Sequence, residues 1–324
     1  MPDTEIILRL NAMGDILLTV PTLRAIAAQG VDVHLVIHGR WAQLAEFLPA
    51  NVHLYNGTGC LIRLAAQLKK LHARAVFDLQ GKLSTIALRS LLGAPITRVY
   101  QKRNISEQLL AIRGKYPLRL SDQRPVWQKY GEVCGVTLDN PDASLNLSPA
   151  YLADCRKILH EQGLEEKGFI LLHPDASKPG KHIPEKLIEA LQNSLPYTTA
   201  LIGTSNTPLP ASFKAMDLRN RFSLHHLPGI IHLAAAVVSS DSGPMHLARA
   251  VNTPIAALYF QTCPSLGFAP VPARNVLVLS EPLPCKPCSL HGQNESCPEQ
   301  HFACREVDIA GTVDKIAKFF TDFI

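Results

Sequence analysis

Residues 238–246, with the sequence VSSDSGPMH, combine the end of an apolar run with small, polar and helix-starting residues. The apolar, partly β-branched run that ends at Val238 predicts a strand. Ser240 or Asp241 can cap the helix that follows, and Gly243-Pro244 fits its first turn. Backbone amides at such a junction, together with the positive end of the helix dipole, favour a phosphate or pyrophosphate. A capped helix start without a ligand is the alternative, because such junctions are common in α/β proteins.

Asp15 is a second candidate for chemistry. It follows a predicted strand at residues 5–10 and precedes a predicted amphipathic helix at residues 16–28. Ligands of open α/β sheets bind at the carboxyl ends of the strands, so Asp15 could act as a general base on a substrate hydroxyl. The alternative is an acid that only stabilises the first turn of its helix.

Lys178 and Lys181 lie in a loop after a predicted strand at residues 169–172. The chain contains no GxGxxG or GxxxxGK[ST] motif, which argues against the usual dinucleotide site and against a P-loop. It also contains no Asp-x-Asp triplet, so a divalent-metal nucleotide site is unsupported and cationic side chains would have to neutralise a leaving phosphate. A flexible basic surface loop is the alternative interpretation of the two lysines.

The segment 285–304 holds four of the eight cysteines, namely Cys285, Cys288, Cys297 and Cys304. The segment begins with a CxxC pair, and cysteine thiolates are typical ligands of tetrahedral zinc. A structural zinc site is therefore one prediction. The last two cysteines do not form a second CxxC pair, and free thiols are the other prediction. We expect the four remaining cysteines to be core residues.

Alternating apolar segments predict an α/β fold with two parallel sheets. In the first half, predicted strands at 5–10, 31–37, 52–55, 75–79 and 96–100 alternate with helices at 16–28, 41–48, 61–71, 83–92 and 126–134. In the second half, predicted strands at 169–172, 198–202, 215–218, 235–238 and 255–259 alternate with helices at 150–162, 184–193, 224–234 and 245–251. The prediction is therefore two Rossmann-like domains, residues 1–148 and 149–308, and a closing helix within 309–324. Their facing sheet edges would form a cleft with Asp15 on one wall and Asp241 on the other.

The 324 residues, 47% of them hydrophobic, can bury two cores. We expect a cytoplasmic protein, because no secretion signal and no apolar run of about 18 residues is apparent, and any membrane contact would be peripheral. The stretch 98–129 is strongly basic, with Arg98, Lys102, Arg103, Arg113, Lys115, Arg119, Arg124 and Lys129. It suits an anionic glycan or anionic lipid headgroups, or it is a solvated basic face. Nucleic acid fits least, because aromatic residues are only 6% of the chain.

Four segments carry a resemblance to a known family: RLNAMGDIL at 9–17, DLQG at 78–81, KHIPE at 181–185 and DSGPMHLA at 241–248. In order and spacing the chain resembles glycosyltransferase family 9, the heptosyltransferase family, over nearly its whole length. The resemblance implies a two-domain GT-B fold. It also implies inverting transfer of heptose from ADP-L-glycero-D-manno-heptose to the inner core of lipopolysaccharide, an anionic glycolipid acceptor, without a required metal or other cofactor.

The same resemblance implies roles for individual residues. Asp15 would deprotonate the acceptor hydroxyl, with Gly14 beside it in the substrate site, and Lys181 would hold the phosphate of the donor. The donor-binding turn would comprise Asp241, Ser242, Gly243 and His246. The enzyme would work in the cytoplasm, at the inner face of the inner membrane if it contacts the membrane.

One loop departs from the family pattern. Many relatives have an acidic residue after the strand at 198–202, where it can hold the ribose of the donor, but this chain has Gly203-Thr204-Ser205-Asn206. Ser205 could still bond to a hydroxyl group, although a neutral side chain weakens the expected nucleotide contact. The alternatives are therefore a glycosyltransferase with another nucleotide sugar, or a non-catalytic glycan- or nucleotide-binding protein on the same scaffold.

Overall fold

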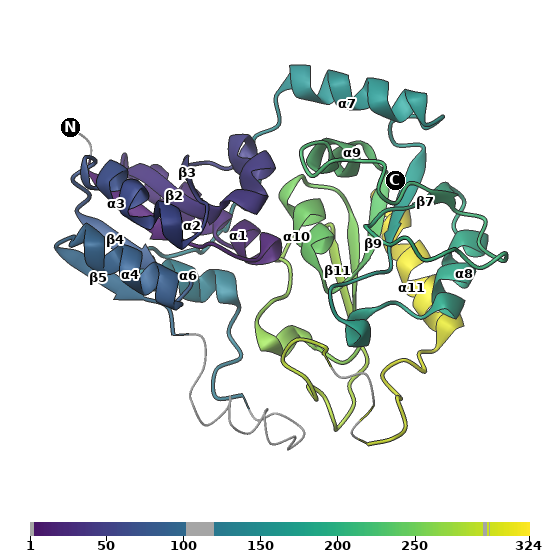
Figure 1. Cartoon of the computed structure of the whole chain (residues 1–324). Helices are drawn as coiled ribbons and strands as arrows, with labels where there is room; N and C mark the ends of the chain where they lie inside the picture. The colour runs from purple at the N-terminus through teal and green to yellow at the C-terminus, as the bar shows by residue number, and fades with distance from the viewer. Residues whose placement is uncertain (1–2, 102–119, 294–296, 298) are drawn as a thin grey trace. The chain divides into compact units, whose positions relative to one another are not determined.

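The structure is a computed structural model that describes residues 3–101, 120–293, 297 and 299–324. The described chain divides into two compact units. The first contains residues 3–101 and 124–146, and the second contains residues from 147 onward together with 120–123. We call them the N-terminal unit and the C-terminal unit. Each is built on one parallel sheet (Figure 1).

The sheet of the N-terminal unit has the strand order β3-β2-β1-β4-β5. Its strands are β1 (Thr4–Leu8), β2 (Asp32–His38), β3 (Asn51–Tyr55), β4 (Ala75–Asp78) and β5 (Ile96–Val99). The apolar run of β1 is buried on both faces, with Ile6 opposite His34 on β2 and opposite Val76 on β4. The chain order reverses between β1 and β4, so the carboxyl ends of these two strands form the switch point where ligands of such sheets bind.

Helices cover both faces of this sheet. They are α1 (Met13–Leu17), α2 (Val20–Ala27), α3 (Leu61–Lys69), α4 (Leu83–Leu92) and α6 (Val126–Cys134), with 3₁₀ turns at Gly39–Phe47 and Thr58–Cys60. Side chains of α3 and α4, among them Leu64, Leu68 and Leu88, pack against the face that carries Ile6 and Leu8. On the other side, α2 packs against α6. This apolar packing holds the loops at the switch point in place.

Two predicted helices of the first half differ from the structure. The helix predicted at 16–28 is two helices, because Pro21 lies in the first turn of α2, where its missing N–H and fixed φ are tolerated. The first of these helices starts three residues earlier than predicted, at Met13, and therefore includes Asp15. The helix predicted at 41–48 is a 3₁₀ helix, Gly39–Phe47.

The sheet of the C-terminal unit has the order β11-β10-β9-β6-β7-β8. Its strands are β6 (Phe169–His173), β7 (Thr198–Leu201), β8 (Met216–Asp217), β9 (Ala236–Ser240), β10 (Ile255–Tyr259) and β11 (Val276–Ser280). The sequence analysis did not identify β11, although its residues VLVLS have an apolar, β-branched pattern. The chain order reverses between β6 and β9, so the loops after these two strands meet at a second switch point.

The helices of this unit are α7 (Pro149–Glu161), α8 (Glu185–Ser194), α9 (Leu227–Leu233), α10 (Gly243–Ala250) and α11 (Ile309–Thr321). Figure 1 shows α8 and α11 side by side, and their apolar side chains form one core with β6, β9 and β10. Helix α9 packs against both α7 and α10. None of the helices in the described ranges is long and apolar enough to cross a membrane.

Candidate active site

Asp15 is the third residue of α1 and lies just beyond the carboxyl end of the central strand β1. Its Oδ2 accepts a hydrogen bond from the Ala12 amide at 3.1 Å and lies 2.5 Å from a guanidinium nitrogen of Arg9, which is buried. Its other oxygen, Oδ1, accepts no hydrogen bond from any described residue. The two contacts to Oδ2 thus hold the carboxylate in a single orientation. The amide contact is that of an acid stabilising a first turn, and the general-base role of Asp15 stays a prediction.

The loop after β4 supports the loop that carries Asp15. Gln80 is buried, and its Oε1 accepts a hydrogen bond from the Asn11 amide at 3.1 Å. The buried Asp78 carboxylate accepts hydrogen bonds from the amides of Gln80 and Gly81. Arg9, besides its ion pair, donates to the carbonyl of Leu79. The DLQG segment therefore has a structural role, in which it joins the two strands at the switch point.

Ser242, and not Ser240 or Asp241, is the N-cap residue of α10. Gly243 and Pro244 occupy the first turn, as predicted. The predicted cap is wrong because Ser240 is the last residue of β9 and its hydroxyl donates to the carbonyl of Asp175 at 2.7 Å. The Ser242 hydroxyl does not bond to the helix amides and lies 3.1 Å from His173 Nδ1. The N-terminus of α10 is thus left without a side-chain cap.

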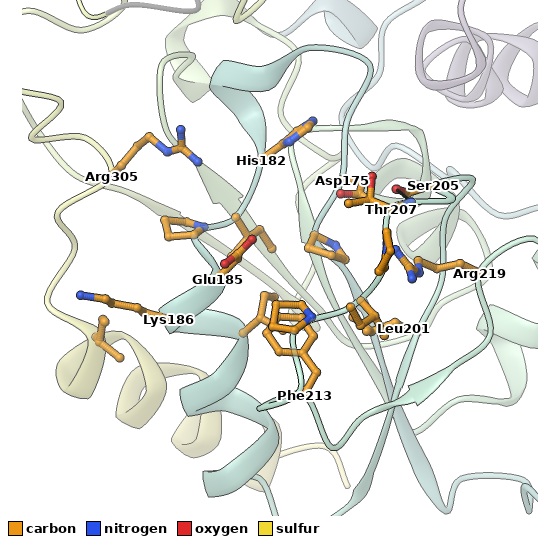
Figure 2. Close-up of a pocket in the computed structure, with 18 of the residues that line it drawn as sticks. Asp175, His182, Glu185, Lys186, Leu201, Ser205, Thr207, Phe213, Arg219 and Arg305 are labelled. Carbon is orange, nitrogen blue, oxygen red and sulfur yellow. Dashed lines mark hydrogen bonds between the residues drawn. The ribbon is translucent and has the colours of Figure 1, made fainter.

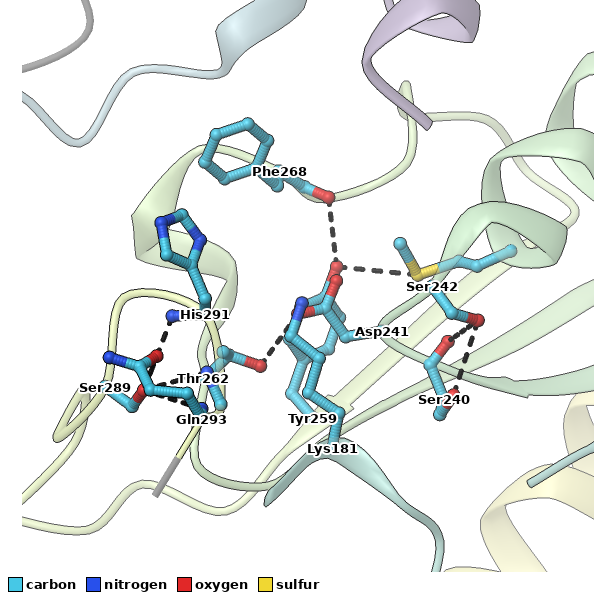
Figure 3. Close-up of polar contacts among 12 residues, drawn as sticks. Lys181, Ser240, Asp241, Ser242, Tyr259, Thr262, Phe268, Ser289, His291 and Gln293 are labelled. Carbon is cyan, nitrogen blue, oxygen red and sulfur yellow. Dashed lines mark hydrogen bonds and ion pairs between the residues drawn. The ribbon is translucent and has the colours of Figure 1, made fainter. Parts of the chain in front are cut away.

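Lys181 and Asp241 form an ion pair at this junction (Figure 3). Lys181 Nζ lies 2.8 Å from Asp241 Oδ2, and the two side chains are only 18% and 8% exposed. The same oxygen accepts a hydrogen bond from Thr262 Oγ1 at 2.8 Å. Because the ammonium neutralises the carboxylate, Asp241 does not repel a phosphate placed beside them. Of the other predicted donor-site residues, His246 is buried on α10, while Lys178 is exposed.

Three residues that position Lys181 are absent from the sequence predictions, namely Gly180, Gln261 and Gly292. A Cβ atom on Gly180 would lie 1.8 Å from Gln261 Oε1, and one on Gly292 would lie 2.6 Å from Lys181 Cγ. The Gly180 amide donates to the Gly292 carbonyl at 3.0 Å, and the Gly180 carbonyl accepts from the Gln261 amide at 3.1 Å. These close backbone approaches join segments that are far apart in the sequence. The Pro-Gly-Lys sequence at 179–181 is the one local signal for them.

The loop that contains Gly292 is part of the same arrangement. Ser289 Oγ accepts hydrogen bonds from the amides of His291, Gly292 and Gln293 and donates to Gln293 Oε1, as Figure 3 shows. The segment that carries the cysteines therefore packs directly against Lys181.

His173, at the carboxyl end of β6, is buried next to this junction, where its Nδ1 lies 3.1 Å from the Ser242 hydroxyl. Burial disfavours the imidazolium form and lowers the pKa of His173 from its ordinary value of 6.5 to about 4. The folded protein therefore keeps this histidine neutral at pH values where the unfolded chain binds a proton.

Acid pH is consequently expected to destabilise the protein through His173. The contribution of neutral His173 to the free energy of unfolding is fully present above pH 6.5. It is lost as the pH falls toward about 4, and the loss is about 3 kcal/mol in total. Urea unfolding followed by circular dichroism at pH 7.5 and at pH 4.5 measures this loss. In His173→Gln the difference between the two pH values should shrink by most of that amount. An unchanged difference would assign the acid sensitivity to other groups.

A cavity of about 730 Å³ lies beside the loop that departs from the family pattern (Figure 2). Asp175, His182, Ser205 and Arg219 are among the residues that line it. The Ser205 hydroxyl accepts a hydrogen bond from the Thr207 amide at 3.2 Å, and Arg219 is held by Asp217 through two contacts of 2.8 and 2.9 Å. The cavity thus offers polar groups of both charges, and the Ser205 hydroxyl, which accepts one hydrogen bond within its loop, can still donate its proton to a ligand.

The four clustered cysteines line one small cavity of about 10 Å³. All eight cysteines lie in the described part of the chain, and none of them forms a disulfide. Outside the cluster, Cys134, Cys155 and Cys263 are buried as expected, but Cys60 is exposed, so it is not the core residue that the sequence predicted. Burial, and then the neighbouring thiols, raise the pKa of Cys288 to about 12. In the described part of the chain, no three His, Cys, Asp or Glu side chains are arranged to hold a metal ion. The structure therefore brings together the predicted zinc ligands without showing a metal-binding geometry, and zinc binding stays a prediction.

Most of the basic stretch lies outside the described residues, including Lys102, Arg103, Arg113, Lys115 and Arg119. Of its described members, Arg98 is exposed on the edge strand β5 and Arg124 pairs with Glu132 at 2.5 Å.

Comparisons with known proteins point to the same family as the sequence motifs. Residues 61–299 match the model of glycosyltransferase family 9 (heptosyltransferase). Lipopolysaccharide heptosyltransferase 1 of Pseudomonas aeruginosa is 23% identical over 312 residues, which cover 87% of this chain and 85% of that protein.

Solved structures show the same fold. A glycosyltransferase family 9 protein from Veillonella parvula superimposes with a TM-score of 0.75 and 17% identity, over 99% of this chain and 97% of that one. An E. coli heptosyltransferase solved with ADP gives a TM-score of 0.61 and 18% identity, over 99% of this chain and 100% of that one. These likenesses confirm the predicted GT-B fold with two Rossmann-like domains. Because the family match covers well over half of its residues, the chain belongs to glycosyltransferase family 9 and is a glycosyltransferase.

Proposed function

We propose that this enzyme transfers heptose from ADP-L-glycero-D-manno-heptose to the inner core of lipopolysaccharide, with inversion at the anomeric carbon. The observation that carries the proposal is the Asp15 carboxylate. One of its oxygens is held by Arg9 and by the Ala12 amide, and the other accepts no hydrogen bond from a described residue. The side chain is 19% exposed, so a substrate hydroxyl can reach this oriented carboxylate and pass its proton to it. Its location at the switch point of the sheet is where a substrate would bind.

The proposed reaction is a single displacement. The acceptor oxygen attacks the anomeric carbon while its proton passes to Asp15, and the bond between that carbon and the β-phosphate oxygen breaks, releasing ADP. The negative charge that develops on the diphosphate is stabilised by the Lys181 ammonium and by the N-terminus of α10. No metal takes part in this scheme, because these groups supply the positive charge.

For the donor, we propose an ADP-sugar. The E. coli relative was solved with ADP, and the Pseudomonas aeruginosa relative is a lipopolysaccharide heptosyltransferase. The cavity beside Ser205 is large enough for a nucleoside, since ligand pockets typically span about 300–1,000 Å³. Because Ser205 stands where relatives have an acid, we expect the ribose to be held by neutral hydrogen-bond partners in this enzyme.

For the acceptor, we propose an anionic glycolipid at the cytoplasmic face of the inner membrane. Two strongly exposed aliphatic side chains support a membrane contact, Ile62 at the start of α3 and Leu83 at the start of α4, which are 77% and 85% exposed. Both helices follow a strand, so these side chains lie toward the sheet edge that also carries Asp15. Arg63 and Lys82, each next to one of them in the sequence, are also exposed, and exposed apolar groups beside basic residues are typical of peripheral membrane surfaces.

Calorimetric titration with ADP-heptose, ADP, UDP-glucose and GDP-mannose tests the donor without the acceptor. We expect ADP-heptose to bind at least about tenfold more tightly than UDP-glucose or GDP-mannose, which corresponds to about 1.4 kcal/mol. A preference for UDP-glucose or GDP-mannose would keep glycosyl transfer and overturn the heptose donor.

A further inference from the structure

Tyr130, in the middle of α6, lies at the base of the Asp15 site. Its side chain is completely buried. The Arg9 guanidinium lies over its ring, 5.5 Å from the ring centre, and the ring of Tyr100 packs edge-on against it at 5.0 Å. Arg9, which pairs with Asp15, is thus held between the carboxylate and an aromatic face.

The polar atoms of this group are incompletely paired. Neither the Tyr130 hydroxyl nor Asp15 Oδ1 makes a hydrogen bond of ordinary length and angle with a described residue, although both atoms are buried, and the contact between the two residues is a weak one. A buried hydroxyl without a partner is destabilising, and a phenylalanine would fill the same space without that cost. A hydroxyl at this position therefore calls for an explanation other than packing.

The chemistry of Tyr130 suits a hydrogen-bond donor to a carboxylate. Burial, and then the charge of the nearby Asp15, raise the pKa of Tyr130 well above its ordinary value of 10. The phenol therefore keeps its proton over the whole range in which an enzyme works. The Arg9 cation stabilises the negative charge of Asp15 through Oδ2. The phenol of Tyr130 is therefore available to donate a hydrogen bond to the other oxygen.

We propose that Tyr130 is a positioning residue for the general base, whose hydroxyl donates to the free oxygen of Asp15 during turnover. The inference rests on the proposed role of Asp15. The buried Oδ1 receives the phenol, while the acceptor hydroxyl approaches the carboxylate through the part of the side chain that is exposed, 19% of its surface. With Arg9 and Ala12 on Oδ2, the carboxylate is then fixed through both oxygens as it takes the proton.

Tyr130→Phe tests the proposal, because it removes one oxygen atom and retains the ring beneath Arg9. We expect kcat to fall about tenfold, while the KM values for donor and acceptor stay within about twofold. Circular dichroism and thermal unfolding check that the variant is folded, and its melting temperature should stay equal or rise. Tyr55→Phe is the matched control, because Tyr55 is another buried tyrosine of the same unit, on β3. The kcat of this control variant should equal that of the wild type.

A second comparison separates positioning from a general structural effect. Under single-turnover conditions, introducing Tyr130→Phe into the wild-type enzyme should slow transfer about tenfold. Introducing it into the Asp15→Asn variant should cause no further loss, because the phenol acts through the Asp15 carboxylate. Equal losses in both backgrounds, or an unchanged kcat in the single variant, would overturn the proposal. The rates are taken with whichever nucleotide sugar the wild type turns over. A wrong donor would therefore refute the proposed heptosyl transfer and leave the test of Tyr130 intact.

Discussion

Asp15→Asn is expected to lower kcat by about 10³-fold and to leave the dissociation constant of the nucleotide sugar within about twofold. The amide has the shape of the carboxylate but cannot take the proton of the acceptor hydroxyl. Donor affinity should persist because the proposed donor contacts are made by Lys181 and α10, in the other unit. Steady-state kinetics and calorimetric titration of the donor measure the two quantities.

The same change affects folding, and a control must separate the two effects. The substitution would leave the Arg9 cation buried without its charged partner, so we expect a loss of about 3 kcal/mol in the free energy of unfolding. Glu5→Gln is the matched control. Glu5 is a buried acid at the opposite end of β1 and pairs with Arg74 at 2.7 Å. This control variant should lose stability but not kcat. If Asp15→Asn kept more than a third of the wild-type kcat, Asp15 would not be the base.

Lys181→Ala should weaken binding of the nucleotide sugar by about 30-fold and should also reduce kcat. A charge-assisted contact to phosphate contributes about 2 kcal/mol, and its loss removes the cation that stabilises the departing diphosphate. The substitution also leaves the Asp241 carboxylate without its cation, so that it repels the donor. Titration with ADP-heptose and with ADP gives the affinity, and the transfer assay gives the rate.

Lys178→Ala provides the control for that experiment. Lys178 carries the same charge three residues earlier, but its side chain is exposed. Its removal should change the affinity by less than about threefold, because exposed charges are screened. The double variant Lys181→Ala, Asp241→Asn should recover part of the lost affinity, since it removes the uncompensated carboxylate. Equal effects of the two single lysine variants would indicate a diffuse charge effect instead of a phosphate contact at Lys181.

Much of the fold could be predicted because its signals are local. The strands of the N-terminal unit alternate with helical segments along the chain, and β4 and α4 lie within one residue of their predicted bounds. The errors also have local causes. Pro21 divides the first helix, and the hydrophobic pattern at 41–48 does not distinguish an α-helix from a 3₁₀ helix. Strand β11 was missed although its pattern is present in the sequence.

The candidate site was predicted only as separate residues. Asp15 and Lys181 were both expected at the carboxyl ends of strands, and the structure places both at switch points. Their partners were not expected. Thr262 lies 21 residues from Asp241, and no motif links the two positions. The Ser242 hydroxyl turns toward His173 because a neighbouring strand brings that ring within reach. The cap predicted at Ser240 or Asp241 is wrong because β9 extends to Ser240, whose hydroxyl donates to the Asp175 carbonyl.

The sequence by itself determined the alternation of strands and helices, the family, and the residues that end each strand at the two sites. These follow from periodicity, turn chemistry and motifs, which act over a few residues. The tertiary structure alone decided the pairing of Arg9 with Asp15, the placement of Tyr130 beneath them and the support of Lys181 by Gly292. Such contacts depend on which strands become neighbours and how closely backbones approach. Those are properties of the packed sheet, and the local sequence around each residue does not encode them.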